Sequence, residues 1–329
     1  MSEALFQIDN LRVSYPQTRR SADVAWAVDG VSLNLAPGER LGLVGESGCG
    51  KSTLGRAAMR LLPSSTQIEG KVFFQNQSVF DLNPENLRRF RGEAVALVFQ
   101  DPMTRLDPLM TIGDHCLETL QAHQPNLSRQ QAKERAIATL ETVKIPASRW
   151  SQYPHEFSGG MRQRVAIALA LLLNPKLIVA DEPTTSLDVT VSAQILQELT
   201  RLCQERQMAL LLISHDLAMV GEYCDRIAVM YNGKVVETGS TQTVLTQPQH
   251  DYTRSLLQAA LHLQAGATAK TSFTQEPVEI AAEKAAPLLR LDNLQKSYTL
   301  EQNFVARLLT RKPDPTIKAV DSVSLDLYP

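Results

Sequence analysis

Long apolar runs are missing from this sequence of 329 residues. The longest one, residues 165–173, is far shorter than the roughly 20 residues that a helix needs to span a bilayer. Residues 1–7 also lack a basic segment followed by an apolar core, so no secretory signal is predicted. We therefore expect a chain that does not cross a membrane by itself, although it could still act on one.

The sequence also has few cysteines and a net charge close to zero. The four cysteines, Cys49, Cys116, Cys203 and Cys224, form no CxxC pair and show no metal-ligand spacing, which indicates a reducing compartment without disulfides. A formal charge of −2 gives no general attraction to nucleic acid or to an anionic membrane. With 43% hydrophobic and 21% charged residues, the composition is that of an ordinary globular protein.

A glycine-rich loop carries the most specific signal. Residues 45–52, here called the phosphate loop, read Gly-Glu-Ser-Gly-Cys-Gly-Lys-Ser and lie between an apolar stretch and an expected helix. Gly45, Gly48 and Gly50 let backbone N–H groups turn toward an anion at a helix N-terminus. Lys51 can reach the β- and γ-phosphates, and Ser52 can ligate magnesium. By chance such a pattern arises in on the order of 1% of chains of this length, so we expect nucleotide binding.

Two further motifs point to phosphate chemistry. Asp181 and Glu182 follow the apolar strand expected at residues 177–180, and ligands gather at the carboxyl ends of parallel strands. Asp181 could hold magnesium and Glu182 could act as the base that orients the attacking water. Ser158, Gly159 and Gly160 precede an apolar helix and expose backbone N–H groups at its start. Taken alone, the first motif is more often a solvated turn and the second only a helix start.

The hydrophobic pattern indicates an α/β core with a helical insertion. Helical spacing dominates residues 111–173, so we place the insertion at about residues 102–170. An Asn232–Gly233 hairpin turn follows the last of the core strands. Strands are expected at residues 5–15, 27–35, 41–44, 72–74, 95–99, 177–180, 209–213 and 227–230.

The end of the chain repeats its beginning. Residues 291–294 (Leu-Asp-Asn-Leu) match residues 8–11 (Ile-Asp-Asn-Leu), and residues 319–327 match residues 27–35 in the same order. The division predicted from this is a first domain at 1–261, a linker at 262–287, and the opening fragment of a second copy at 288–329. That fragment stops just before its own phosphate loop would begin.

Together these motifs resemble the ABC ATPases. The phosphate loop, Gln100, Ser158–Gly160, Asp181–Glu182, residues 186–188 and His215 occur in the order of that family, across residues 5 to about 240. Residues 99–103, 153–155, 158–164, 181–185 and 252–257 resemble more narrowly the ATPases of dipeptide, oligopeptide and nickel importers. The repeat resembles the members with two ATPase domains in tandem.

The resemblance implies a P-loop NTPase core of the ABC ATPase type, with an antiparallel β subdomain and a helical subdomain. It implies that Tyr15 stacks on adenine, and that Lys51, Ser52 and Thr53 serve the phosphates of ATP and Mg²⁺. Gln100 would sense the γ-phosphate, contribute to the Mg²⁺ site with Ser52 and Asp181, and contact the membrane partner. His215 would act beside Glu182 in catalysis. The segment Ser158–Gly160 would complete the site of another ATPase domain in a head-to-tail dimer.

The function implied is that of an ATP-hydrolysing importer subunit for peptides or related solutes, at the cytoplasmic face of the membrane. Its partners would be transmembrane permease subunits, a second ATPase domain and, indirectly, an extracytoplasmic substrate-binding protein, with no nucleic acid. Arg105 and Asp107 depart from the Ser and Asn of the family pattern in the segment that faces the permease.

Two rival functions stay open at this stage. A soluble tandem ABC ATPase acting on the ribosome or nucleic acid would need a basic surface or a charged arm between its domains, and the linker has little Lys or Arg. A regulatory module without hydrolysis would not need Glu182 and His215.

Overall fold

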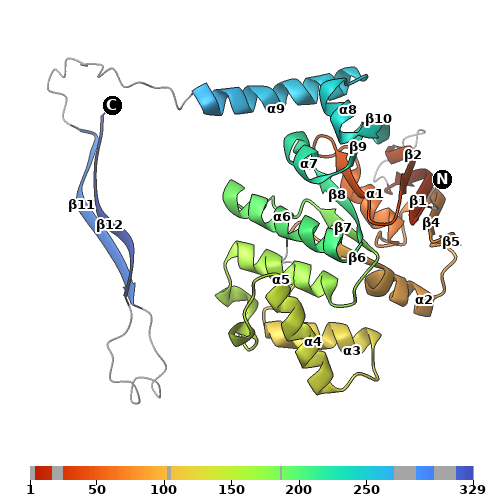
Figure 1. Cartoon of the computed structure of the whole chain (residues 1–329). Coiled ribbons are helices and arrows are strands. Elements are labelled where there is room, and N and C mark those ends of the chain that lie inside the picture. Colours follow the sequence, from red (N-terminus) through yellow and green to blue (C-terminus); the bar gives the residue numbers. More distant parts are fainter. Residues whose placement is uncertain are drawn as a thin grey trace. The chain divides into compact units, whose positions relative to one another are not determined.

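The computed structural model describes residues 4–16, 25–101, 105–185, 187–269, 287–299 and 316–328. The chain divides into two compact units, Met1–Ala267 and Thr268–Pro329, each treated by itself below (Figure 1). Among the described residues, no helix combines the length and the apolar character that crossing a bilayer requires.

A six-stranded sheet forms the centre of the first unit. Its order is β10-β9-β3-β8-β7-β6, and all neighbours are parallel except β10, which pairs antiparallel with β9. The strands are β3 (Arg40–Val44), β6 (Val95–Val98), β7 (Leu177–Asp181), β8 (Ala209–Ser214), β9 (Arg226–Tyr231) and β10 (Lys234–Ser240). Strands β7 and β8 are buried at every position, as expected for parallel strands covered on both faces.

Two hydrophobic cores lie on the two faces of this sheet. Leu210 and Leu212 of β8 pack into one core with α5 (Gly159–Leu171), α6 (Val189–Glu205) and α7 (Leu217–Tyr223). Leu211 and Ile213 point into the other, with α1 (Lys51–Ala58) and a four-stranded antiparallel sheet. That second sheet has the order β2-β1-β4-β5 and consists of β1 (Phe6–Ser14), β2 (Trp26–Leu35), β4 (Gln67–Phe74) and β5 (Gln77–Ser78).

The helical part lies at one end of the first unit (Figure 1). Helices α3 (Ile112–His123) and α4 (Arg129–Thr142) both start with capping boxes, Thr111 with Asp114 and Ser128 with Gln131. They pack with α5 in the core that covers the central sheet. The short helix α2 (Pro84–Arg89) leads toward β6. The expected fold class, a nucleotide-binding α/β core with an antiparallel β part and a helical part, is confirmed.

The first unit ends in two helices, α8 (Thr241–Thr246) and α9 (Asp251–Ala269). Helix α9 therefore continues past residue 262, where the sequence predicted the start of a linker. The rest of that predicted linker lies outside the described residues, apart from residue 287.

The second unit contains the hairpin of β11 (Leu289–Thr299) and β12 (Thr316–Leu327), which reproduces the pairing of β1 with β2. Leu291 faces Leu325 as Ile8 faces Leu33. The N–H of Asn293 donates to Ser324 Oγ at 3.0 Å, and that of Asn10 donates to Ser32 Oγ at 2.9 Å. The predicted repeat of sequence is thus also a repeat of local structure, including a left-handed asparagine in each copy.

Candidate nucleotide site

The phosphate loop leaves β3 and enters α1 with its backbone pressed against neighbouring strands. Gly50 caps α1 at a φ of 104°, and a Cβ there would lie 2.2 Å from the carbonyl oxygen of Ala27. A Cβ on Gly45 would lie 2.2 Å from the carbonyl oxygen of Met230. Only glycine fits both positions, so the loop sequence is fixed by its surroundings as well as by its expected ligand.

Lys51 is held inside this loop. Its side chain is buried, and Nζ donates to the carbonyl oxygens of Gly45 at 2.7 Å and Glu46 at 2.9 Å. These neutral carbonyls hold the ammonium where it can exchange them for the oxygens of an arriving phosphate.

Ser52 and Asp181 meet although 129 residues separate them, with Ser52 Oγ donating to Asp181 Oδ1 at 2.7 Å. Asp181 is 1% exposed, and Arg56 Nη2 lies 3.4 Å from its other oxygen. A hydroxyl and a carboxylate oxygen side by side, next to an expected phosphate, are the donors that Mg²⁺ takes together with water. These two residues fit the metal that the sequence predicted.

A second group of side chains surrounds Glu182, the residue that follows β7. Its carboxylate Oε2 lies 3.4 Å from Gln100 Nε2 and 3.4 Å from His215 Nδ1, and it accepts a hydrogen bond from Thr185 Oγ1 at 2.9 Å. Glu182 also has a φ of 46°, unusual for a residue with a side chain, and its N–H donates to Ile213 of β8. Strained conformations of this kind concentrate at functional sites.

The structure thus brings Gln100, Glu182 and His215 together. Gln100 lies beside Glu182, and within the described part of the chain it makes no hydrogen bond to Ser52 or Asp181. Ser186 and residues 102–104 of the quoted motifs lie outside the described residues.

Tyr15 stands next to the phosphate loop. Its hydroxyl lies 3.1 Å from Thr53 Oγ1, and the side chain is 40% exposed. An exposed aromatic ring beside a phosphate site is available to stack on a base.

Ser158, Gly159 and Gly160 form the start of α5. Ser158 caps the helix by accepting from the N–H of Met161 at 3.4 Å, and a Cβ on Gly160 would lie 2.6 Å from Val191. Within the described ranges, no hydrogen bond or ion pair joins these three residues to the phosphate loop or to Glu182. They are not brought into the same site.

Two contacts of the site were missed at the sequence level. Thr185 holds Glu182 through its hydroxyl, and the spacing of three residues after a strand end was a signal for such a turn. Tyr252 in α9 accepts a hydrogen bond from the N–H of Glu46 at 2.9 Å. No local pattern predicts that contact, because 206 residues separate the two.

Cys49 differs from what its place in the loop suggests. A helix N-terminus and a nearby Lys51 would favour the thiolate, and Lys51 Nζ lies 3.8 Å from its sulfur. Burial nevertheless raises the pKa of Cys49, and the opposing effect of Lys51 is smaller. Burial therefore outweighs the two features of the loop that favour the thiolate.

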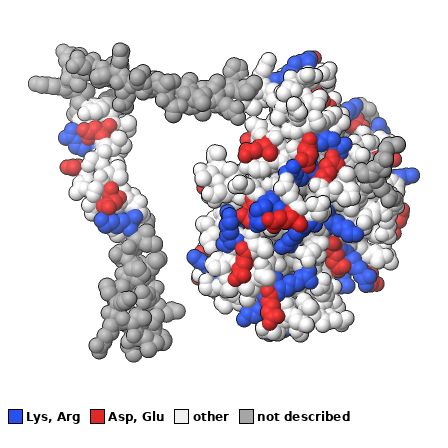
Figure 2. Space-filling model, in the orientation of Figure 1, with Lys and Arg blue, Asp and Glu red and all other residues white. Residues whose placement is uncertain are grey.

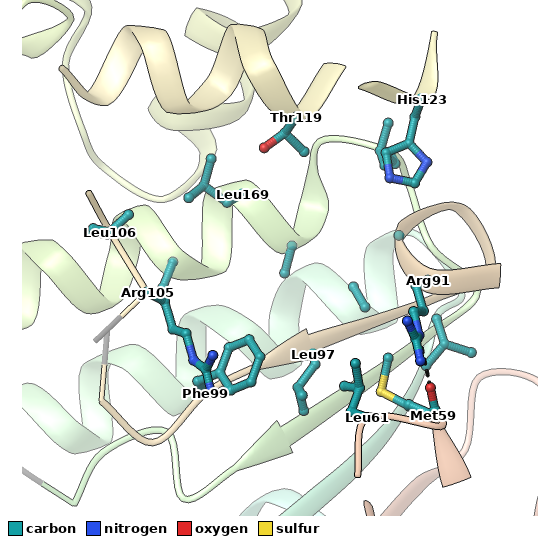
Figure 3. A pocket seen from close by; sticks show the side chains of 16 residues that line it. Met59, Leu61, Arg91, Leu97, Phe99, Arg105, Leu106, Thr119, His123 and Leu169 are labelled. Carbon is teal, nitrogen blue, oxygen red and sulfur yellow. Dashed lines mark hydrogen bonds between the residues drawn. The ribbon is translucent and has the colours of Figure 1, made fainter. Parts of the chain in front are cut away.

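An apolar pocket of about 300 Å³ lies where β6 meets the helical part (Figure 3). Leu97, Phe99 and Leu169 line it, and the Arg105 guanidinium lies over the Phe99 ring at 4.1 Å. Arg91, in the same lining, donates from Nε to the carbonyl oxygen of Met59 at 3.0 Å. Phe99, which lines this pocket, directly precedes Gln100 of the site around Glu182.

Acidic and basic side chains are interspersed over the face seen in Figure 2, without a broad basic patch on its described residues. This face offers no electrostatic footprint for nucleic acid.

Comparison with known proteins places these features in a family. Residues 28–185 match the family model described as ABC transporter. The chain is 43% identical to the oligopeptide transport ATP-binding protein OppD of Escherichia coli, over 87% of this chain and 85% of the relative. It is 41% identical to the dipeptide transport ATP-binding protein DppD of Bacillus subtilis, over 84% and 83%.

A third relative is longer. The glutathione import ATP-binding protein GsiA of Escherichia coli is 40% identical over 98% of this chain, but the chain spans only 54% of GsiA. Solved structures agree on the fold. The dimeric ATP-binding cassette MJ0796 bound to ADP and Pi is 28% identical, with a TM-score of 0.63 over 72% of this chain and 98% of that one. For cbiO1 of Clostridium perfringens the identity is 26% and the TM-score 0.64, over 82% and 100%.

A loop that cradles phosphate, a Ser–Asp pair suited to Mg²⁺ and a glutamate held beside a histidine all lie in a fold shared with ATP-binding cassettes. The chain belongs to the ABC transporter family, as one of its ATP-binding, ATP-hydrolysing proteins.

Proposed function

We propose that this chain is the ATP-hydrolysing subunit of an importer for peptides or related small solutes. The observation that carries the hydrolytic part is the Glu182 carboxylate, placed by Gln100, Thr185 and His215 at the edge of a sheet that also presents Asp181. The class of solute is supported by the names of the oligopeptide, dipeptide and glutathione relatives.

In the proposed site, Lys51 and the loop N–H groups bind the β- and γ-phosphates, and Thr53 and Tyr15 bind the nucleotide beside them. Ser52 and Asp181 would hold Mg²⁺ together with water, with Gln100 as a further ligand. The metal supplies charge neutralisation on the phosphate oxygens. Glu182 orients and deprotonates the attacking water, and His215 holds the γ-phosphate.

The segment Ser158–Gly160 serves a second ATPase domain in this proposal. Ser158 is exposed at a helix start, Gly159 and Gly160 are half-buried, and the segment makes no hydrogen bond or ion pair with the phosphate loop among the described residues, as expected of a segment that completes a partner's site. A head-to-tail dimer of two such domains then holds each ATP between one phosphate loop and the other domain's Ser158 segment. The partner domain is another copy, a related chain or a second domain of a longer protein.

The permease would dock on the pocket beside Phe99, which Figure 3 displays. An apolar hollow lined by Phe99, the residue before Gln100, would suit an apolar helix face of a membrane subunit and would place it close in sequence to the residues around Glu182. The chain would then work as a peripheral subunit at the cytoplasmic face of the inner membrane. The extracytoplasmic binding protein would contact the permease and not this chain.

The second unit is proposed to be the start of a second ATPase domain. Its hairpin copies the register of β1 and β2, and the chain spans about half the length of the glutathione relatives. The rival function on ribosome or nucleic acid has no support from Figure 2 or from the relatives named above.

Transport with purified parts tests this proposal. The chain would be affinity-purified from membranes, its co-purifying permease identified, and the complex reconstituted with a binding protein in vesicles. We expect ATP-dependent uptake of labelled peptide, abolished by Lys51→Ala. A complex that hydrolyses ATP but moves no peptide would overturn the solute class, and an absence of any permease would overturn the importer function.

A further inference from the structure

Helix α9 is the last helix of the first unit in sequence, and its first turn contacts the phosphate loop. The Tyr252 hydroxyl accepts the hydrogen bond from the N–H of Glu46 at 2.9 Å. The Tyr252 ring also packs against Tyr231, with ring centroids 4.3 Å apart. Tyr231 is the last residue of β9. It follows Met230, whose carbonyl oxygen leaves no room for a side chain on Gly45. One side of the loop is therefore enclosed by β9 and α9.

The start of α9 is itself firmly anchored. The Glu237 carboxylate of β10 accepts from the N–H groups of Gln249 at 2.8 Å and His250 at 3.0 Å. Burial works against the ionised form of Glu237, but the Gln249 N–H, the Thr253 side chain and the His250 N–H together outweigh it and lower its pKa. Thr253, the residue after Tyr252 in the first turn of α9, is fully buried. Tyr252 therefore projects from a fixed support, as a positioning group must.

Glu46 is held at both ends of its backbone. Its N–H donates to Tyr252, and its carbonyl oxygen accepts from Lys51 Nζ at 2.9 Å. If Lys51 turns to the phosphates when ATP binds, the Glu46 carbonyl keeps only the N–H of Cys49, at 3.3 Å and within the loop itself, while Tyr252 still holds the Glu46 N–H from outside the loop. The Tyr252 hydroxyl is then the side-chain contact that keeps Glu46, near the start of the phosphate loop, in place.

We propose that Tyr252 is a positioning residue for the phosphate loop, so that the first turn of α9 forms part of the frame of the nucleotide site. It acts through Glu46 and touches neither ATP nor metal. The proposal rests on the proposed nucleotide site. It also means that a change in the position of α9 would change the affinity for ATP.

The variant that tests this is Tyr252→Phe in the full chain. It removes the hydroxyl and keeps the ring that packs against Tyr231. The matched control is Tyr231→Phe in the same ring pair, because the Tyr231 hydroxyl has no hydrogen-bond partner among the residues that the structure describes. Melting temperatures of both variants check that the fold is kept.

We expect Tyr252→Phe to weaken ATP binding by a factor of about 3 to 10, the effect of losing one neutral hydrogen bond. Turnover at saturating ATP should stay near that of the parent, and Tyr231→Phe should match the parent in both. A second readout needs no activity: alkylation of Cys49 in nucleotide-free protein, at one fixed alkaline pH, should be faster in Tyr252→Phe because the loop opens more often.

Unchanged ATP affinity and unchanged Cys49 alkylation in Tyr252→Phe would overturn the inference. An equal loss in Tyr231→Phe would also overturn it, because the ring pair and not the hydrogen bond would then be responsible. If the parent itself binds no ATP, it is the proposed nucleotide site that fails, which separates the two claims.

Discussion

Glu182 is the residue on which hydrolysis depends. Replacing it by Gln keeps the shape and the contact with Thr185 but removes the carboxylate that orients the water. We expect turnover to fall by a factor of about 10² to 10⁴ while ATP still binds, because the phosphate loop is untouched. Steady-state hydrolysis and equilibrium binding of a fluorescent ATP analogue measure the two effects. Near-normal hydrolysis by Glu182→Gln would remove the catalytic assignment.

Cys49 gives a prediction that depends on pH. Since burial raises the pKa of its thiol, the reactive thiolate is rare at neutral pH and increases as the pH rises toward that pKa. Alkylation by a small reagent should therefore be slow at pH 7, accelerate about tenfold per pH unit above it, and be blocked by bound ATP. Burial raises the pKa of Cys116, Cys203 and Cys224 to about 12, so they should react far less.

Mass spectrometry of the alkylated protein identifies the cysteine that reacts. Fast modification of Cys49 at pH 7, with no further increase at higher pH, would show that its pKa is lowered and that the buried position described here is wrong.

Residues joined by a local motif were predictable from sequence. Lys51 and Ser52 follow from one loop, and Asp181 and Glu182 follow from one strand end, because the carboxyl ends of the parallel strands β3, β8 and β7 lie at the same edge of the sheet. Thr185 and Tyr252 were not predicted. Thr185 acts through hydrogen bonds from its hydroxyl to the carboxylate and the carbonyl oxygen of Glu182, and Tyr252 acts through one hydrogen bond that joins residues far apart in the sequence.

At the scale of elements, the strands and the helical part were predictable from the period of their apolar residues and from the turn residues between them, because each element buries one face. The end of α9 was not, since residues 262–269 are rich in alanine, have no apolar period and include Gly266, a residue type that commonly ends a helix.

The hairpin of β11 and β12 provides the element-scale prediction. Leu294, Val323 and Leu325 are 45%, 44% and 56% exposed, while their counterparts in the first unit, Leu11, Val31 and Leu33, are buried. Two strands without a packing partner are marginally stable. In a monomeric sample of this chain we expect hydrogen exchange in β11 and β12 to be much faster than in β7. Exchange as slow as in β7 would mean that the hairpin is covered and structured.

At the scale of the molecule, the first unit has its own two cores and needs nothing from the second to fold. Deleting residues 270–329 keeps α9 and its contact with the phosphate loop. We expect the shortened chain to bind ATP with the affinity of the full chain and to melt at a similar temperature. A large loss of affinity would show that the second unit contributes to the site.

The central claim is that each ATP is hydrolysed between the phosphate loop of one domain and the Ser158 segment of another. Two variants separate these halves. Lys51→Ala disables the loop, and Ser158→Asp keeps a good helix cap while placing a negative charge where the γ-phosphate would lie. Each variant alone should hydrolyse ATP at a small fraction of the parent rate.

The decisive measurement is the ATPase rate of an equal mixture of Lys51→Ala and Ser158→Asp, made with chains that lack residues 270–329 so that only one complete domain is present. Mixed dimers contain one intact composite site, so the mixture should recover up to about a quarter of the parent rate at high protein concentration. The parent rate per chain should itself rise with protein concentration. A mixture as inactive as its components, together with a parent rate independent of concentration, would contradict the account.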